Sequence, residues 1–194
     1  MIIRKFIFTL LFFLFLSQIS FAATYEIDPV HSNLGFAVKH LMVSTVRGSF
    51  TNFSGEIRFD PKDTKVFETD VVIQTQSIDT RNLKRDDHLR SSDFLDAAGY
   101  PTINFKGKKL SGKKGGYTII GDLTIRGVSK EISIPVEISG PVESPFGTQV
   151  IGISGETAIN RQDFGVSWNK VMDQGGLVVD NNVKLVIDIE AKKK

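Results

Sequence analysis

From Thr24 onward, hydrophobic residues alternate with polar or small residues along much of the chain. The alternation is clearest in the stretches 34–39, 117–126, 131–138 and 183–190, where apolar residues recur two positions apart. A period of two is typical of β-strands that bury one face and expose the other to water. The pattern therefore predicts an all-β domain of antiparallel strands.

Clusters of glycine and proline separate the alternating stretches. The segments 111–116, 126–129 and 140–147 have the composition of hairpin turns, because glycine and proline relieve the backbone strain of a chain reversal. They predict strands near 102–110, 116–126, 130–140 and 148–159. Between Arg47 and Asp60 the apolar residues switch from one parity to the other, which predicts a β-bulge near Thr51 and Asn52.

One segment breaks the strand pattern. Asp79 and Thr80 have the residue types of a helix N-cap, and they predict a short helix over 81–90. Its sequence offers Leu83 and then little that is apolar until Leu89 and the residues after it. This composition favours a surface helix that covers one end of a barrel.

The predicted strands are about 10 residues, or roughly 33 Å, long. Closing such strands into a barrel removes exposed sheet edges. An eight-stranded barrel has an interior that is either filled by side chains or just wide enough for a small ligand. The residues alone leave both alternatives open.

Residues 1–22 differ from the rest of the chain. Arg4 and Lys5 precede an apolar run from Phe6 to Leu16, and small residues follow at Ser20 and Ala22. This order predicts a secretory signal peptide cleaved between Ala22 and Ala23, which leaves one domain over residues 23–194. The apolar run is too short for a good membrane span.

Composition and charge narrow the class of protein further. The chain has 194 residues, 41% of them hydrophobic and none of them cysteine, which excludes a disordered chain and a disulfide-stapled miniprotein. Loss of the signal peptide lowers the 24 Lys and Arg to 22, equal to the 22 Asp and Glu. A neutral chain without a clustered basic face predicts no nucleic-acid partner. The expected location is the periplasm.

A transmembrane barrel is excluded by the polar face of the strands. Such a barrel turns apolar residues toward lipid and polar residues toward its lumen. Here the polar parity carries Lys39, Asp122, Arg126, Glu131, Glu137, Lys184 and Asp188. These charges would face lipid at high cost, so the apolar rows must point inward.

Several motifs follow one another across essentially the whole mature chain. They include Tyr25-Glu-Ile-Asp28-Pro-Val-His31-Ser32, Phe36-Ala-Val38-Lys-His40, Arg85-Asp-Asp-His88-Leu89, Gly121-Asp-Leu-Thr-Ile-Arg-Gly-Val-Ser-Lys130 and Asn160-Arg161-Gln-Asp-Phe164-Gly165. In their sequence and order these motifs resemble the YceI-like family. The resemblance implies a lipocalin-like, eight-stranded, up-and-down antiparallel barrel with a long apolar channel. It also implies an exported protein, often dimeric, that holds an isoprenoid or another long-chain amphiphile.

On that resemblance, the inward apolar rows are candidates for the channel lining. The predicted ligand-binding residues are Phe36, Val38, Phe50, Phe105, Leu123, Ile125, Ile134, Phe164 and Trp168. Aromatic and branched side chains suit an isoprenoid because they bury its methyl-branched units. Arg161 is predicted either to pin a turn or to meet the ligand's polar head group.

The sequence gives little sign of catalysis or of a metal. His31, His40 and His88 lack the close spacing of metal ligands, and no nucleophile elbow, phosphate loop or dinucleotide motif is present. Asp86 and Asp87 are expected to be helix-surface charges paired with nearby arginines. The leading hypothesis is a non-enzymatic carrier without a cofactor. A lipid-modifying or metal-dependent enzyme, and a purely structural barrel, remain alternatives.

Overall fold

The computed structural model describes residues 22–171 and 176–194. The predicted signal peptide therefore lies, apart from Ala22, outside the described residues. The strands are β1 (Ala23–Ile27), β2 (Asn33–His40), β3 (Ser44–Phe50), β4 (Phe53–Phe59), β5 (Phe67–Gln74), β6 (Ile78–Asp79), β7 (Thr102–Lys113), β8 (Gly116–Ile125), β9 (Val128–Glu143), β10 (Gln149–Asn160) and β11 (Val179–Lys193). The helices are α1 (Leu83–Arg90) and the short 3₁₀ turns η1 (Thr75–Ser77) and η2 (Arg161–Phe164).

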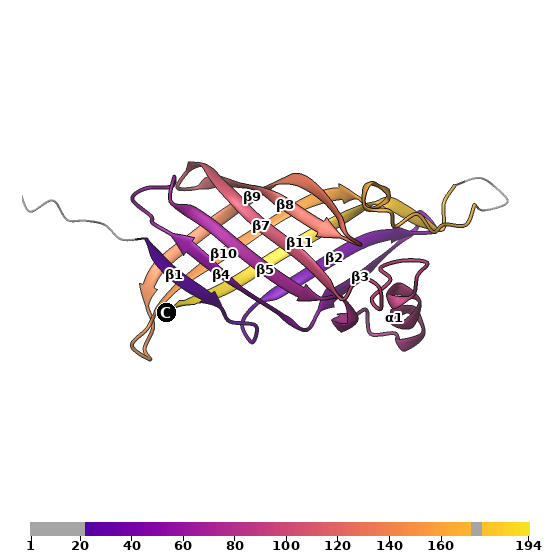
Figure 1. The fold of residues 1–194 in the computed structure, drawn as a ribbon, viewed down its shortest axis with the longest axis horizontal. Helices are drawn as coiled ribbons and strands as arrows, with labels where there is room; N and C mark the ends of the chain where they lie inside the picture. The colour runs from indigo at the N-terminus through magenta and orange to yellow at the C-terminus, as the bar shows by residue number, and fades with distance from the viewer. Residues whose placement is uncertain (1–21, 172–175) are drawn as a thin grey trace, which may run out of the picture.

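Eight strands close into an antiparallel barrel (Figure 1). They pair in the order β1-β4-β5-β7-β8-β9-β10-β11, and β11 pairs back to β1. The remaining strands prolong this barrel: β2 continues β1 along β11, and β3 pairs with β2 and with β6. The predicted all-β, up-and-down, eight-stranded barrel is confirmed, and the four hairpin strands form within a few residues of their predicted ends.

The chain leaves the sheet at the predicted irregularity. Strand β3 ends at Phe50 and β4 begins at Phe53, so that Thr51 and Asn52 separate them. The Thr51 amide donates to the Ser77 carbonyl, and the Gln74 amide donates to the Asn52 carbonyl. These bonds hold Thr51 and Asn52 beside η1 and the end of β5. The inward apolar residues change parity at this point, between β3 and β4.

One end of the barrel is filled with side chains. Seven large hydrophobic residues there are at most 8% exposed and belong to the main core: Tyr25, Phe59, Phe67, Leu110, Tyr117, Ile138 and Ile151. This packed end is the one nearest the C-terminus, at the left in Figure 1. The closely packed side chains hold the strands together and close the barrel interior at this end.

Helix α1 lies at the opposite end, at the right in Figure 1. It is shorter than predicted, because Asn82 rather than Asp79 or Thr80 is its N-cap, and the Asn82 side chain accepts from the Arg85 amide. Thr80 instead binds Asp86 through its amide (2.9 Å) and its hydroxyl (2.5 Å). Asp86 is buried, so its expected role as a surface charge is wrong. Asp87 is exposed and pairs with Arg90, as expected.

No helix in residues 22–171 or 176–194 is both long enough and apolar enough to cross a membrane.

Candidate ligand-binding cavity

The open half of the barrel encloses a cavity of about 220 Å³. Its wall is made of inward residues from the strands, together with residues in and directly after α1 and η2. All of its lining side chains are aliphatic or phenylalanine, except those of Gly35, Thr69 and Arg161. An engineered cavity of about 150 Å³ is enough to bind benzene, so this space is a binding-sized cavity and larger than a packing defect.

Eight of the nine apolar residues predicted for the lining do line this cavity. They are Phe36, Val38, Phe50, Phe105, Leu123, Ile125, Ile134 and Phe164. The alternation placed the seven that lie in strands, because residues two apart on a strand share a face, whereas Phe164 lies in η2. Their contact with a ligand remains a prediction.

Trp168 does not line the cavity. It lies in the loop after η2, where strand parity has no meaning, and its ring packs edge-on against His88 and at a tilt against Phe94, with centroids 4.9 and 5.0 Å apart. Phe94 is buried and does line the cavity. Trp168 therefore packs against the lining residue Phe94 without itself lining the cavity.

Arg161 pins the loops at the open end. It donates to the backbone carbonyls of Val166, Trp168, Val179 and Asp180 and to Oδ1 of Asn181. These bonds use all five N–H groups of a guanidinium. Burial lowers the pKa of Arg161, and the Asp180 carboxylate acts in the opposite direction. The predicted turn is confirmed, whereas a head-group contact would have to replace one of these bonds.

Sequence reasoning missed several lining residues. Leu89, Phe94 and Leu95 reach the cavity from α1 and the chain after it, and β11 contributes Val183, Leu185, Ile187 and Ile189. The β11 row carried the same alternation that identified Leu123, so the signal was present. Leu89, Phe94 and Leu95 follow no strand period, and only the tertiary fold brings them over the opening.

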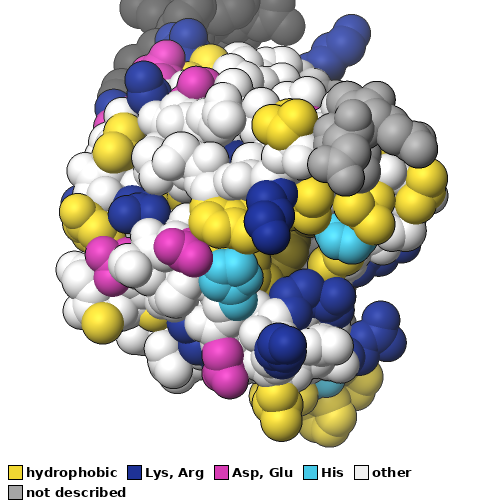
Figure 2. Space-filling view, turned by 90° about the vertical axis from the view of Figure 1, so that its right-hand side faces the viewer, with side chains coloured by type: hydrophobic (Ala, Val, Ile, Leu, Met, Phe, Trp, Pro, Cys, Tyr) yellow, Lys and Arg dark blue, Asp and Glu magenta, His cyan; other side chains and the backbone are white. Residues whose placement is uncertain are grey.

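The cavity opens at the end that carries α1. Figure 2 looks onto this end and shows a hollow with hydrophobic side chains in its depth and Lys, Arg and His side chains around it. Phe36, Val38 and Phe50 are only partly buried, in contrast with the residues of the packed end. The barrel therefore combines the two alternatives left open by the sequence: one end is filled, and the other end is hollow.

Gly48 lets the wall form where β2 and β3 pair. A Cβ atom at this position would lie 2.6 Å from the Phe36 ring and 2.7 Å from Thr80 Cγ2. The missing side chain allows Phe36 to lie across the β3 backbone and to approach Phe50, with ring centroids 6.1 Å apart.

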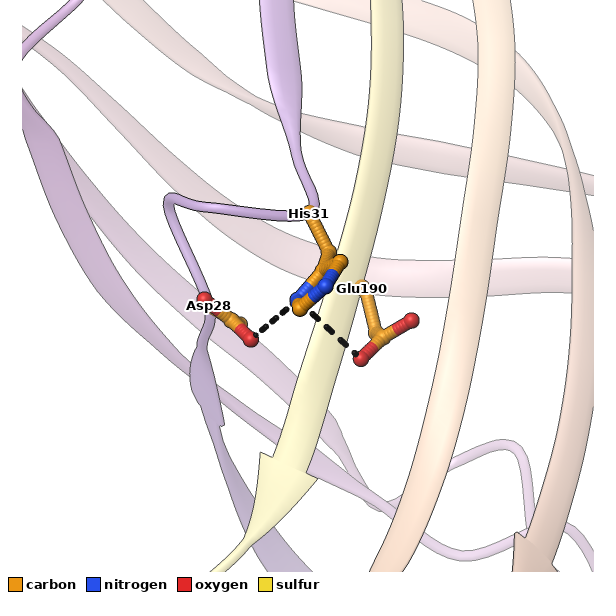
Figure 3. A group of neighbouring side chains, drawn as sticks. All are labelled: Asp28, His31 and Glu190. Atoms are coloured by element: carbon orange, nitrogen blue, oxygen red, sulfur yellow. Dashed lines mark hydrogen bonds and ion pairs between the residues drawn. The ribbon is translucent and has the colours of Figure 1, made fainter. Parts of the chain in front are cut away.

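Outside the cavity, Asp28, His31 and Glu190 come together where the chain passes from β1 to β2 (Figure 3). His31 Nδ1 lies 2.7 Å from Asp28 Oδ2 and 3.9 Å from Glu190 Oε1. Asp28 also accepts from the Val30 amide, and Lys192 Nζ lies 2.5 Å from Asp28 Oδ2. These contacts fasten the β1–β2 connection onto β11, which is the strand that closes the barrel.

The same three residues offer the ligand atoms of a metal site, which sequence spacing did not indicate. His31 and Glu190 are far apart in the chain, and only the closure of the barrel joins them. However, the Lys192 ammonium already neutralises Asp28, and a divalent cation would have to displace it. The arrangement fits a structural role better than a metal centre. We call Asp28, His31, Glu190 and Lys192 the clasp.

The clasp predicts a pH-dependent contribution to stability. Lys192, and then His31, hold the pKa of Asp28 well below its ordinary value. The clasp should stabilise the fold above about pH 4, the ordinary Asp pKa, and this contribution should be lost as the pH falls from there toward the lower pKa of the folded state. Asp28→Asn should lower the free energy of unfolding at pH 7 by about 1–3 kcal/mol.

Urea unfolding at a series of pH values tests this prediction. The wild type should lose stability more steeply than Asp28→Asn below about pH 4. Asp63→Asn, on an exposed turn, serves as the control. Parallel stability curves for the wild type and Asp28→Asn would contradict the clasp.

Comparison with known proteins agrees with the fold and the motifs. Residues 25–191 match the YceI-like domain. A UPF0312 protein of Staphylococcus aureus strain MSSA476 is 36% identical over 167 residues, which cover 86% of this chain and 95% of that protein. The solved YceI protein of Campylobacter jejuni is 35% identical, with a TM-score of 0.70 over 80% of this chain and 90% of that one.

A more distant structure shares the architecture. The polyisoprenoid binding domain from Saccharophagus degradans is 17% identical, with a TM-score of 0.66, and the match covers 89% of this chain and 99% of that one. At this identity the likeness concerns the fold. The domain match and the relatives above 30% identity, together with the closed barrel, show that the chain belongs to the YceI-like family.

Proposed function

We propose that the protein is an exported carrier that holds the apolar tail of an isoprenoid or a similar long-chain amphiphile in its barrel. The observation that carries the proposal is the cavity, whose lining is apolar except for Thr69 and Arg161, and which is sealed at one end and open at the other. Burial of apolar surface contributes roughly 25 cal/mol per Å². A hydrocarbon chain therefore gains most by entering with its tail toward the packed end.

The size of the cavity sets the length of tail that fits without rearrangement. Because about 150 Å³ holds a benzene ring, 220 Å³ suits only the innermost prenyl units of a chain. A longer tail would require wall side chains near the opening, such as Phe36 and Phe50, to turn aside. The branched aliphatic wall favours a methyl-branched chain.

The polar head group is proposed to remain at the open end. Lys130 is two residues before Ile132 on β9, and His40 is two residues after Val38 on β2. Both residues therefore continue inward rows beyond the last lining residue. Since the N–H groups of Arg161 are already occupied, Lys130 and His40 are better placed than Arg161 to meet a head group.

The chemistry of the wall supports binding over catalysis. Among the described residues, Arg161 is the one ionisable side chain that lines the cavity, and Thr69 is the one hydroxyl. The Thr69 hydroxyl donates to the Glu56 carbonyl. General acid–base chemistry needs a positioned group that can exchange a proton with the substrate, and this wall presents none. The name of the Saccharophagus degradans domain is consistent with an isoprenoid as the ligand class.

Organic extraction followed by mass spectrometry tests the carrier function. Protein purified from the exported fraction without detergent should release close to one amphiphile per barrel, with a hydrocarbon tail. A protein that is free of lipid, and that fails to take up a fluorescent prenyl probe, would contradict the proposal. Turnover of a lipid that is abolished by a chelator would favour the enzyme alternative.

Export has its own test. The intact mass of the protein from the exported fraction should correspond to a chain that begins at Ala23, the first residue of β1. Cleavage there would leave every residue of the barrel in place. An exported chain that retains Met1 would show that residues 1–22 are not a cleaved signal. The homodimer that the family resemblance allows also stays a prediction, which the native mass would test.

A further inference from the structure

The turn between β2 and β3 forms a protruding tip beside the opening of the cavity. The Leu41 amide donates to the Val178 carbonyl, and the Val178 amide donates to the Lys170 carbonyl. Val171 pairs with Leu177 in an isolated bridge. The turn and the chain before β11 therefore lie side by side. We call Leu41, Met42, Val43 and Val171 the apolar tip.

The side chains of the apolar tip are exposed. Leu41 is 39% exposed, Met42 57%, Val43 81% and Val171 76%. They lie close to the cavity, because the lining residue Val38 is three positions before Leu41 and the lining residue Val179 directly follows Val178. Exposed apolar side chains that gather next to a binding site are a feature of interaction surfaces.

The backbone of the turn adds a second observation. Leu41 and Met42 have φ angles of 51° and 61°, in the left-handed region. Glycine or asparagine adopts this conformation more easily than a bulky apolar residue does. The turn thus holds large apolar side chains outward at a conformational cost, and such costs are typical of functional sites.

Positive charge surrounds the tip. Lys39, Arg47 and Lys170 are exposed, and among the described residues none of them has a carboxylate partner within 4 Å. The turn between β9 and β10 also projects an apolar side chain: Phe146 is 93% exposed there, and the charged residue nearest to it in the sequence is Glu143. The turn between β2 and β3 differs from it by combining apolar with basic side chains.

We propose that the apolar tip docks the open end of the barrel onto the surface of a bilayer that contains anionic lipid. Val43, Met42 and Val171 enter the region between head groups and acyl chains, and the lysines bind the head groups. The cavity then opens toward the acyl chains, so a tail passes between bilayer and barrel with little exposure to water. This role rests on the proposed carrier function, which needs a source for its ligand.

A second copy of the chain fits the tip less well. Two basic tips would repel each other, whereas anionic head groups attract them. Four side chains also make a much smaller contact than the 1,200–2,000 Å² or so that a stable protein interface buries.

Vesicle flotation with the mature protein tests the docking. Wild-type protein should float with vesicles of phosphatidylethanolamine and phosphatidylglycerol, and it should bind pure phosphatidylcholine vesicles less. Val43→Asp should weaken binding to the anionic vesicles by about tenfold or more, and Lys39→Glu by about tenfold. Added salt should weaken the binding of the wild-type protein to the anionic vesicles. Phe146→Asp, the matched control at the packed end, should bind as the wild type does.

Ligand content, measured on the same samples, separates this proposal from the carrier function. Wild-type protein that contains an amphiphile but does not float with anionic vesicles overturns the docking alone. Protein that floats through the tip but neither contains nor takes up an amphiphile supports the docking and overturns the carrier function. Equal flotation of the wild type and Val43→Asp overturns the docking. So does a Val43→Asp effect that is confined to the native mass of the protein, because that result assigns the tip to self-association.

Discussion

Leu123→Trp is expected to abolish uptake of a prenyl probe while the barrel stays folded. Leu123 is 6% exposed and lines the cavity from β8, opposite Phe105 on β7. An indole at this position would extend into space that the tail would otherwise occupy. Because the volume already exists, we expect the free energy of unfolding to fall by less than about 1 kcal/mol, compared with roughly 1–3 kcal/mol for overpacking a filled core.

Probe fluorescence and the urea midpoint, read on the same samples, check this expectation. Ser133→Trp is the matched control, since Ser133 is exposed on the outer face of β9 directly before the lining residue Ile134. The control should bind the probe normally. A Leu123→Trp variant that is strongly destabilised, with a wild type that takes up no probe, would mean that the interior works as an ordinary core.

Arg161→Met is expected to be the most destabilising single substitution at the open end. Methionine has similar length but donates to none of the five oxygen atoms, of which the Val179 carbonyl keeps its bond from the Asn169 side chain. The loss should be about 3 kcal/mol, because a buried acceptor without a partner loses 1–3 kcal/mol and water reaches some of these atoms. Arg161→Lys, which keeps the charge but has fewer N–H groups, should lie in between.

Trp168 reports the same event in its fluorescence, since it is the single tryptophan of the chain. Release of the loop should move Trp168 away from Phe94 into water and shift its emission to longer wavelength. Lys170→Met, in the same loop, should change stability by less than about 0.5 kcal/mol. If Arg161→Met unfolds at the wild-type urea concentration with unchanged emission, Arg161 does not hold the loop.

The barrel was predictable because its signal is repeated in several strands. Each inward row has a period of two, and residues such as Leu123 and Ile125 could be placed without knowledge of their neighbours. The predictions failed where one local pattern had to stand alone. Thr80 resembled an N-cap but bonds with the buried Asp86, and Trp168 resembled a wall residue but lies in a loop. The cavity depends on how side chains from all strands together fill the interior. It could therefore not be predicted from the pattern of any single strand.

The seal formed by Tyr25, Phe59 and Phe67 has a consequence for traffic through the barrel. In the carrier proposed above, a ligand would leave through the same opening by which it entered, head group first and tail last. Such a carrier would not act as a conduit with a donor at one end and an acceptor at the other. Loading and unloading would take turns at one opening, so donor and acceptor would compete for the same surface. An acceptor in excess would then block reloading as well as hasten release.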